Sequence, residues 1–305
     1  MLFRSRDRSG KTPLHFAATD GHLDVAQILL DRNADVNSKD ADGFTPLLLA
    51  TQKGEHNVVQ SLLSRDADAQ VHNNCGDTPL LLAADLGHFE VALLLLEHNV
   101  EVDVRNDDGS TPFSRASGNG NHNIMRLLLD HNADAHVRDS TGNTPLHHAA
   151  IYGHREVARR LLQLDVEINS RNDHGSTPLL LAAENGCTTV LQLLLDHDAD
   201  VYARDGKGNT SLHCAALGKS LEVVSILLGL NVEVNSRNVD EQTPLHRATG
   251  EYGLTEIKLE LIRLLLNYGA DVHARDSSGK TASEVAARDE YQKDILDLIS
   301  HCASK

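Results

Sequence analysis

A tripeptide recurs along almost the whole chain at a fixed interval. Thr-Pro-Leu begins at Thr12, Thr45, Thr78, Thr144, Thr177 and Thr243, and the variants Thr-Pro-Phe and Thr-Ser-Leu begin at Thr111 and Thr210. Each step is 33 residues or a multiple of 33, and a ninth copy begins at Thr281, 38 residues after Thr243. Such a period is typical of stacked supersecondary units, so it overrides the two-domain organisation that a length of 305 residues would suggest.

Each copy has the composition of a helix start. Threonine at the N-cap accepts a hydrogen bond from an unpaired helix N–H, and proline at the first helical position loses no bond because its nitrogen carries no hydrogen. An alanine follows five residues after the threonine in all nine copies, which lets neighbouring helices approach closely. A left-handed glycine is then expected to end the helix at Gly21, Gly54, Gly87, Gly120, Gly153 and Gly186.

A second amphipathic helix follows each glycine. Val91, Leu94 and Leu95 show the helical spacing of its apolar stripe. One repeat cannot bury this stripe by itself, so the next repeat must stack on it. Asp42-Gly43 and its equivalents then supply turn residues between one repeat and the next.

The 33-residue period and the pattern Thr-Pro-Leu-His-x-Ala, present at Thr12–Ala17 and Thr144–Ala149, resemble the ankyrin-repeat family. The resemblance covers nearly the whole chain. It implies an all-α solenoid of nine helix-turn-helix repeats with projecting β-hairpin-like fingers. It also implies that the histidines three residues after the repeat threonine link neighbouring fingers and helices; these are His15, His147, His213 and His246.

The chain is expected to form a single solenoid over residues 1–305. The repeats fall near 7–39, 40–72, 73–105, 106–138, 139–171, 172–204, 205–237, 238–275 and 276–305. Five extra residues in the eighth repeat, between Thr249 and Leu261, are expected to lengthen the start of its second helix by about one turn. In the seventh repeat Lys219 stands where the left-handed glycine belongs, which predicts strain.

The two ends of the array differ. Ser283 replaces the usual leucine in the last repeat, and polar residues suit a capping repeat: Glu284, Arg288, Glu290, Lys293, Asp294 and Asp297. Only six residues precede the first finger, so the apolar outer side of the first repeat is expected to lack a neighbour. A fragment of a longer chain and a covering partner both fit that expectation.

Composition disfavours several classes of protein. A formal net charge of −16 and the absence of Trp disfavour nucleic-acid binding. No apolar run approaches the roughly 18 residues of a membrane span, and the N-terminal arginines precede no apolar stretch that would make a signal peptide. The cysteines are scattered without a C-x-x-C pair, so we expect free thiols in the cytoplasm or the nucleus; they are Cys75, Cys187, Cys214 and Cys302.

No catalytic residue, cofactor or metal site is predicted. Eighteen histidines invite a metal hypothesis, but no i, i+4 His pair or Cys pair supplies a tetrahedral set. Gly206-Lys207-Gly208 lacks the spacing of a phosphate-binding loop and falls at a finger tip. The chain is therefore not expected to be an enzyme.

The resemblance implies a partner surface on the concave side, made by finger tips and first helices. Residues that vary between repeats at those places are the candidates: Phe44, Asp77, Asp85, Leu86, Ile151, Tyr152, Glu184, Asn185 and Leu217. Ile151 and Tyr152 are the best anchors, because exposed aromatic and large apolar side chains dominate interface energetics. The alternative is that they are ordinary scattered surface residues.

Basic residues fill one column of the repeat, directly before each new unit. The column comprises Lys39, His72, Arg105, Arg138, Arg171, Arg204, Arg237 and Arg275. Stacked repeats would align these groups into a basic stripe that could read an acidic or phosphorylated segment. The favoured alternative is a structural and solubility role, in which each pairs with a finger carboxylate such as Asp139 or Asp205.

Two functions are consistent with these features. The first is a scaffold or adaptor that binds another protein on its concave surface, as a monomer or as part of a larger chain. The second is the targeting or regulatory arm of a larger enzyme, such as a ubiquitin ligase, kinase or NTPase, whose catalytic domain lies elsewhere.

Overall fold

The computed structural model describes residues 5–250, 256–286, 295 and 297–299. The chain divides into two units, residues 1–140 and 141–305. Paired helices and tight turns make up both units, with only an isolated β-bridge between Arg275 and Thr281 in the described part. The expected all-α fold is therefore confirmed.

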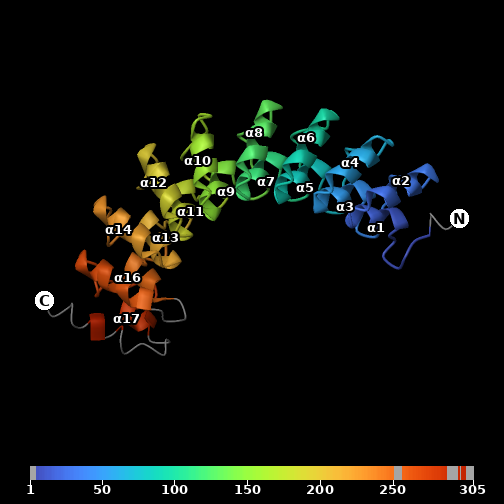
Figure 1. Cartoon of the computed structure of the whole chain (residues 1–305). Coiled ribbons are helices and arrows are strands. Elements are labelled where there is room, and N and C mark those ends of the chain that lie inside the picture. Colours follow the sequence, from blue (N-terminus) through green and yellow to red (C-terminus); the bar gives the residue numbers. More distant parts are fainter. Residues whose placement is uncertain (1–4, 251–255, 287–294, 296, 300–305) are drawn as a thin grey trace. The chain divides into compact units, whose positions relative to one another are not determined.

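Four helix pairs form the first unit (Figure 1). The helices are α1 (Pro13–Thr19), α2 (Leu23–Asp31), α3 (Pro46–Lys53), α4 (His56–Leu63), α5 (Pro79–Leu86), α6 (Phe89–Glu97), α7 (Pro112–Gly118) and α8 (His122–Asp130). The odd-numbered helices pack in one row and the even-numbered helices in a second row. Each odd helix also contacts the even helix that follows it, so a repeat is one helix hairpin.

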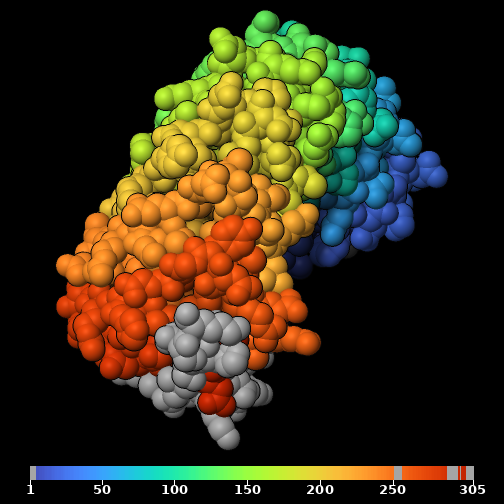
Figure 2. Space-filling model, turned by 90° about the vertical axis from the view of Figure 1, so that its left-hand side faces the viewer, coloured from blue at the N-terminus to red at the C-terminus, as the bar shows by residue number. Residues whose placement is uncertain are grey.

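The second unit continues the same pattern. Its helices are α9 (Pro145–Tyr152), α10 (Arg155–Leu162), α11 (Pro178–Glu184), α12 (Thr188–Asp196), α13 (Ser211–Gly218), α14 (Leu221–Gly229), α15 (Pro244–Thr249), α16 (Glu256–Asn267) and α17 (Ala282–Val285). Figure 2 shows the successive repeats of this unit as bands from yellow-green to red. The repeat, not a sheet or a central core, is the organising element.

The Thr-Pro pairs begin the first helices as predicted. Each repeat threonine is an extended N-cap, and proline or serine occupies the first helical position from α1 to α15. In α5, for example, the Thr78 hydroxyl accepts a hydrogen bond from the Leu81 backbone N–H at 3.3 Å. These caps satisfy donors that the helix itself leaves unpaired.

The alanine five residues after each threonine is buried in every repeat. Its exposure is 3% at Ala17, 1% at Ala286 and zero at the seven positions between them. A larger side chain here would separate neighbouring first helices, since interiors are packed at near-crystalline density. The second helices bury their leucines and valines in the same way, for example Leu94 and Leu95.

The turns between the second helix of one repeat and the first helix of the next form the fingers, and single backbone bonds connect consecutive finger tips. The Asn74 N–H donates to the Asp42 carbonyl at 3.1 Å, and the Gly206 N–H donates to the His174 carbonyl at 2.8 Å. Gly175 is left-handed at φ +71°, and a Cβ there would lie 2.7 Å from the Gly206 nitrogen. Glycine is therefore required by both conformation and space.

The exposed apolar side of the first repeat is observed. Phe16, Val25 and Ile28 are 48%, 47% and 57% exposed. At the other end, Ser283 is half-buried and Glu284 and Asp297 are exposed. The remaining cap residues of the prediction, Arg288, Glu290, Lys293 and Asp294, lie outside the described residues, as does Cys302.

The extra residues of the eighth repeat lengthen its second helix, as predicted. The helix α16 has 12 residues, whereas α2 to α14 of the even series have 8 or 9. Its added turn exposes Ile257 at 47% and buries Lys258 completely. Residues 251–255 lie outside the described part, so the loop before the helix is not characterised.

Four repeat histidines connect the first helices to the next finger. In His213, Nδ1 accepts from the Thr210 backbone N–H at 3.2 Å, and Nε2–H donates to the Gln242 carbonyl at 2.9 Å. His15 makes the same two bonds with Thr12 and Phe44. Both bonds require a neutral ring with its proton on Nε2. The structural role that the resemblance implied is confirmed.

Burial lowers the pKa of the His213 imidazole from its ordinary 6.5 to about 4, although the bond to Gln242 opposes this shift. Burial also lowers the pKa of His15. The unfolded chain therefore binds protons below pH 6.5 that the folded chain does not, and acid favours unfolding.

The His213 shift predicts a loss of about 3 kcal/mol of stability as the pH falls from 6.5 to 4. His213→Gln should show a shallower loss in this window, because its side chain does not titrate there. Urea unfolding midpoints measured across the window test this, with the exposed His174→Gln as the matched control. Parallel curves for the wild type and His213→Gln would contradict the assignment.

Lys219 adopts the left-handed conformation expected of it, at φ +56°. The equivalent residue of the preceding repeat is Gly186, at φ +68°. A left-handed residue with a Cβ carries an energetic cost of about 1–2 kcal/mol that glycine avoids. The predicted strain site in the seventh repeat is therefore present.

Lys219→Gly should raise the free energy of unfolding by about 1 kcal/mol, because strain relief exceeds the added backbone entropy of the unfolded chain. Thermal and urea unfolding measure the change. Gly186→Lys, the reverse exchange at the same place in the repeat, should lower stability. A neutral or destabilising effect of Lys219→Gly would show that the backbone is relaxed there.

Candidate partner-binding surface

The predicted anchors differ in exposure. Leu86 and Tyr152 both stand at the last residue of a first helix, α5 and α9, and are 46% and 62% exposed. Ile151 and Leu217 stand one residue earlier in their repeats and are half-buried. Tyr152 and Leu86 are therefore available to a partner, whereas Ile151 and Leu217 expose only part of their side chains to solvent.

Phe44 and Asp77 are used within the protein. Phe44 is half-buried and packs against Leu48, Val71 and Leu82. The Asp77 carboxylate accepts from Asn73 Nδ2 at 3.2 Å and from Asn106 Nδ2 of the next finger at 2.9 Å. These two residues hold fingers in place, which their variability in the sequence did not reveal.

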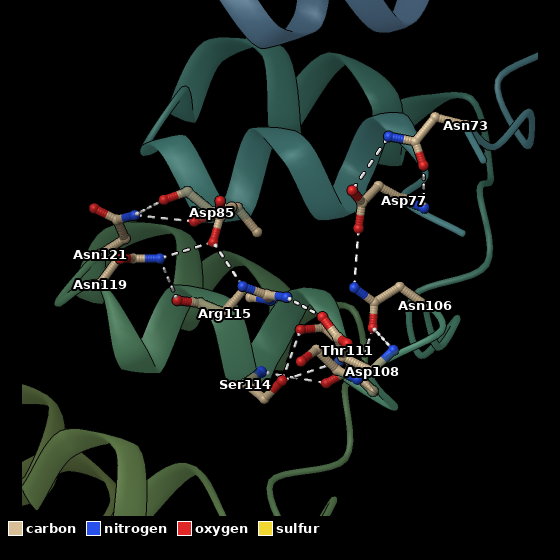
Figure 3. A network of polar contacts seen from close by, with 12 residues as sticks. Asn73, Asp77, Asp85, Asn106, Asp108, Thr111, Ser114, Arg115, Asn119 and Asn121 are labelled. Atoms are coloured by element: carbon tan, nitrogen blue, oxygen red, sulfur yellow. Dashed lines mark hydrogen bonds and ion pairs between the residues drawn. The ribbon is translucent and has the colours of Figure 1, made fainter. Parts of the chain in front are cut away.

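Asp85 belongs to a polar network on the first unit, shown in Figure 3. Its carboxylate accepts from Asn119 Nδ2 at 2.9 Å and lies 3.7 Å from Arg115 Nη1. Arg115 Nη2 in turn donates to Asp108 in the finger at 3.2 Å. The network joins α5, α7 and a finger tip, so Asp85 has partners of its own.

A hollow of about 520 Å³ lies on the second unit, between its fingers and first helices. Its lining includes Glu184 and Leu217, which were predicted, and Lys207, Cys214 and Arg247, which were not. Glu184 is half-buried, and its carboxylate makes no hydrogen bond or ion pair among the described residues. This hollow therefore brings charged groups that have no ion-pair partner in the described part of the chain together with apolar surface on the candidate face.

The basic column joins consecutive fingers through backbone carbonyls. Arg204 Nη1 donates to the carbonyls of Gly208 in its own finger at 2.9 Å and of Arg237 in the next at 2.8 Å. The same bond to the next column residue is made by Arg105, Arg171 and Arg237, and by Lys39 through Nζ. The side chains of Arg105, Arg138, Arg171, Arg204 and Arg237 remain exposed.

The predicted pairing of a column arginine with the Asp205 carboxylate is wrong. Its carboxylate accepts from Lys207 N at 2.9 Å and Asn209 N at 2.8 Å, and Arg204 makes no ion pair with it. An aspartate at a finger start caps its own turn, which removes it from pairing with the arginine beside it. Arg237 does pair with a finger carboxylate, Glu241, at 3.1 Å.

Sequence reasoning missed three exposed or unpaired groups. Tyr202 is 69% exposed and Val239 is 65% exposed, both on fingers. Each replaces a residue that is small or polar at that place in other repeats, such as Asn169 or Asp173, so a signal was available. The third is Arg247.

The described residues hold no group of three or more His, Cys, Asp or Glu side chains placed to bind a metal ion. Cys75 is an exposed free thiol and Cys187 a half-buried one. Cys214 is buried, which strongly raises the pKa of its thiol. A thiol with a raised pKa is a poor nucleophile at neutral pH.

Comparison with protein families agrees with the repeat geometry. A model of three ankyrin repeats matches residues 34–106, 99–172, 165–238 and 212–305, and a second ankyrin-repeat model matches residues 3–50. The chain belongs to the ankyrin-repeat family. Ankyrin repeats generally bind other proteins and are typically non-catalytic.

A short segment also resembles a plant protein. Over 31 residues the chain is 55% identical to acyl-CoA-binding domain-containing protein 2 of Arabidopsis thaliana. The match covers 10% of this chain and 9% of the length of that protein. None of the helices in the part of the ankyrin-repeat chain that the structure describes is long and apolar enough to cross a membrane.

Arg204→Leu should lower the free energy of unfolding by about 1 kcal/mol, because it removes two exposed hydrogen bonds, one within its own finger and one to the next finger. Urea unfolding measures the loss. Arg160→Leu is the control, since exposed Arg160 bonds only to nearby Gln163 on the same helix hairpin. If Arg204→Leu were as neutral as the control, the column would have no structural role.

Proposed function

We propose that this ankyrin-repeat chain is a binding module that holds a partner protein against its first helices and finger tips. Two observations support this surface. The residues that recur in every repeat form helix caps, pack between helices or bond one finger to the next. The exposed apolar and unpaired charged groups on the first helices and fingers are departures from the repeat.

The exposed thiol of Cys75 and the absence of disulfides among the described cysteines support a reducing compartment, the cytoplasm or the nucleus.

Tyr152 carries this proposal. It ends the first helix of its repeat, at a place where other repeats have Lys53, Asn119 or Asn185. Its side chain is 62% exposed, and its ring centroid lies 6.2 Å from that of His154. An exposed aromatic ring of limited flexibility gives a partner a large contact area at low entropic cost.

Affinity capture with mass spectrometry should name a partner, and titration of that purified partner then tests the surface. Tyr152→Ala should weaken binding by about tenfold or more, because anchors of this kind contribute about 2 kcal/mol, and should leave the melting temperature unchanged because the ring is exposed. Tyr268→Ala is the matched control, since Tyr268 is 50% exposed directly after the second helix α16. Equal affinity of the Tyr152 and Tyr268 variants would contradict the proposed surface.

A further inference from the structure

Arg115 and Arg247 occupy the same place in two repeats. Each stands four residues after its repeat threonine, Thr111 or Thr243, on the first helices α7 and α15. The Nε atom of each is buried and lacks a hydrogen-bond partner. The backbone thus sets both guanidinium groups in equivalent positions, one in each unit.

Their terminal nitrogens differ in what surrounds them. Arg115 reaches Asp85 on the preceding first helix and Asp108 in its own finger, at 3.7 and 3.2 Å. The place of Asp85 is taken by Leu217 in the repeat before Arg247. Asp240 takes the place of Asp108, yet it makes no ion pair with Arg247. The Arg247 guanidinium has no hydrogen-bond or ion-pair partner anywhere in the described part of the chain.

Arg247 lines the hollow of about 520 Å³ on the second unit. Leu181 and Leu217 supply apolar surface there, and Lys207 adds a second positive charge at the finger tip. A guanidinium that is partly removed from water and lacks a counter-charge favours an anion with two acceptor oxygens.

The acidic groups of the hollow do not satisfy this guanidinium. Asp205 is occupied by the Lys207 and Asn209 amides of its own finger. Glu184 stands two repeats before Arg247, beyond the reach of an ion pair across helices spaced about 8–10 Å apart. Asp173 lies on the finger two repeats before Arg247 and is exposed.

We propose that Arg247 binds the carboxylate of an Asp or Glu side chain in an extended segment of the partner. This inference rests on the proposed binding function. The first unit shows the chemistry that the position accepts, since the equivalent Arg115 is occupied by two carboxylates from within the chain. Leu217 has no carboxylate to offer where Asp85 supplies one in the first unit, and the partner supplies the missing acid. Glu184 then faces a neutral or basic residue of the same segment.

Selection of random linear peptides against the full chain tests this assignment. Peptides enriched by the wild type should share an Asp or Glu at one position, and exchange of that residue for Asn or Gln should weaken binding by about tenfold. Arg247→Leu should cause a similar loss, and the two changes together should cost no more than either alone. Arg247→Glu should instead accept the peptide with Lys at that position.

Arg263→Leu is the matched control. Arg263 lies in the same repeat but on the second helix α16, where it is exposed and does not line the hollow. This variant should bind the selected peptides with wild-type affinity. Thermal unfolding of the three variants confirms that each remains folded before affinities are compared.

Peptides without a shared acid, undiminished binding to Arg247→Leu, or failure to enrich any peptide would each overturn the inference. A preference for phosphoserine over glutamate at the selected position would also overturn the carboxylate assignment. The proposed binding function is decided separately, by the captured partner and the Tyr152 variant. The assignment of a partner carboxylate to Arg247 can therefore fail while the proposed binding function stands.

Discussion

Burial of one repeat's apolar face by the next repeat is the interaction on which the rest of the structure depends. A single helix hairpin of this chain leaves residues such as Val25 and Ile28 in water, as the first repeat shows. In interior repeats the equivalent Val58 is only 1% exposed. Stability is thus a sum of nearest-neighbour interfaces, and every polar feature of the repeat has to preserve that stacking distance.

The hydrogen bonds between repeats fix how one repeat is positioned on the next, which apolar packing alone would not. A hydrophobic interface tolerates sliding, but the His213 bonds to Thr210 and Gln242 tie a helix start to the next finger. The arginine column adds a second tie at the finger base, and the tip amides add a third. Together these directional bonds set the register of one repeat on the next within each unit.

Helix starts, left-handed turns and buried alanines were predictable because each follows from a local rule repeated eight or nine times. Lys219 and the longer α16 could be located as departures from that rule. The roles of Phe44 and Asp77 could not, because they depend on contacts 27 to 38 residues away whose geometry the spacing leaves open. The arginine column was correctly placed, yet its partners are backbone carbonyls, which no side-chain pattern encodes.

A repeat protein can bind selectively only through residues that the repeat does not use. In the first unit Arg115 pairs with Asp85 and Asp108, and these ion pairs connect α5, α7 and a finger. In the second unit Leu217 stands in the place of Asp85, and Asp240, in the place of Asp108, makes no ion pair with Arg247, so the equivalent guanidinium has no internal partner among the described residues. The stacking interface survives because α13 and α15 still bury Ala215 and Ala248 between them. Binding specificity can therefore arise from a substitution that removes an internal partner, without any change in the fold.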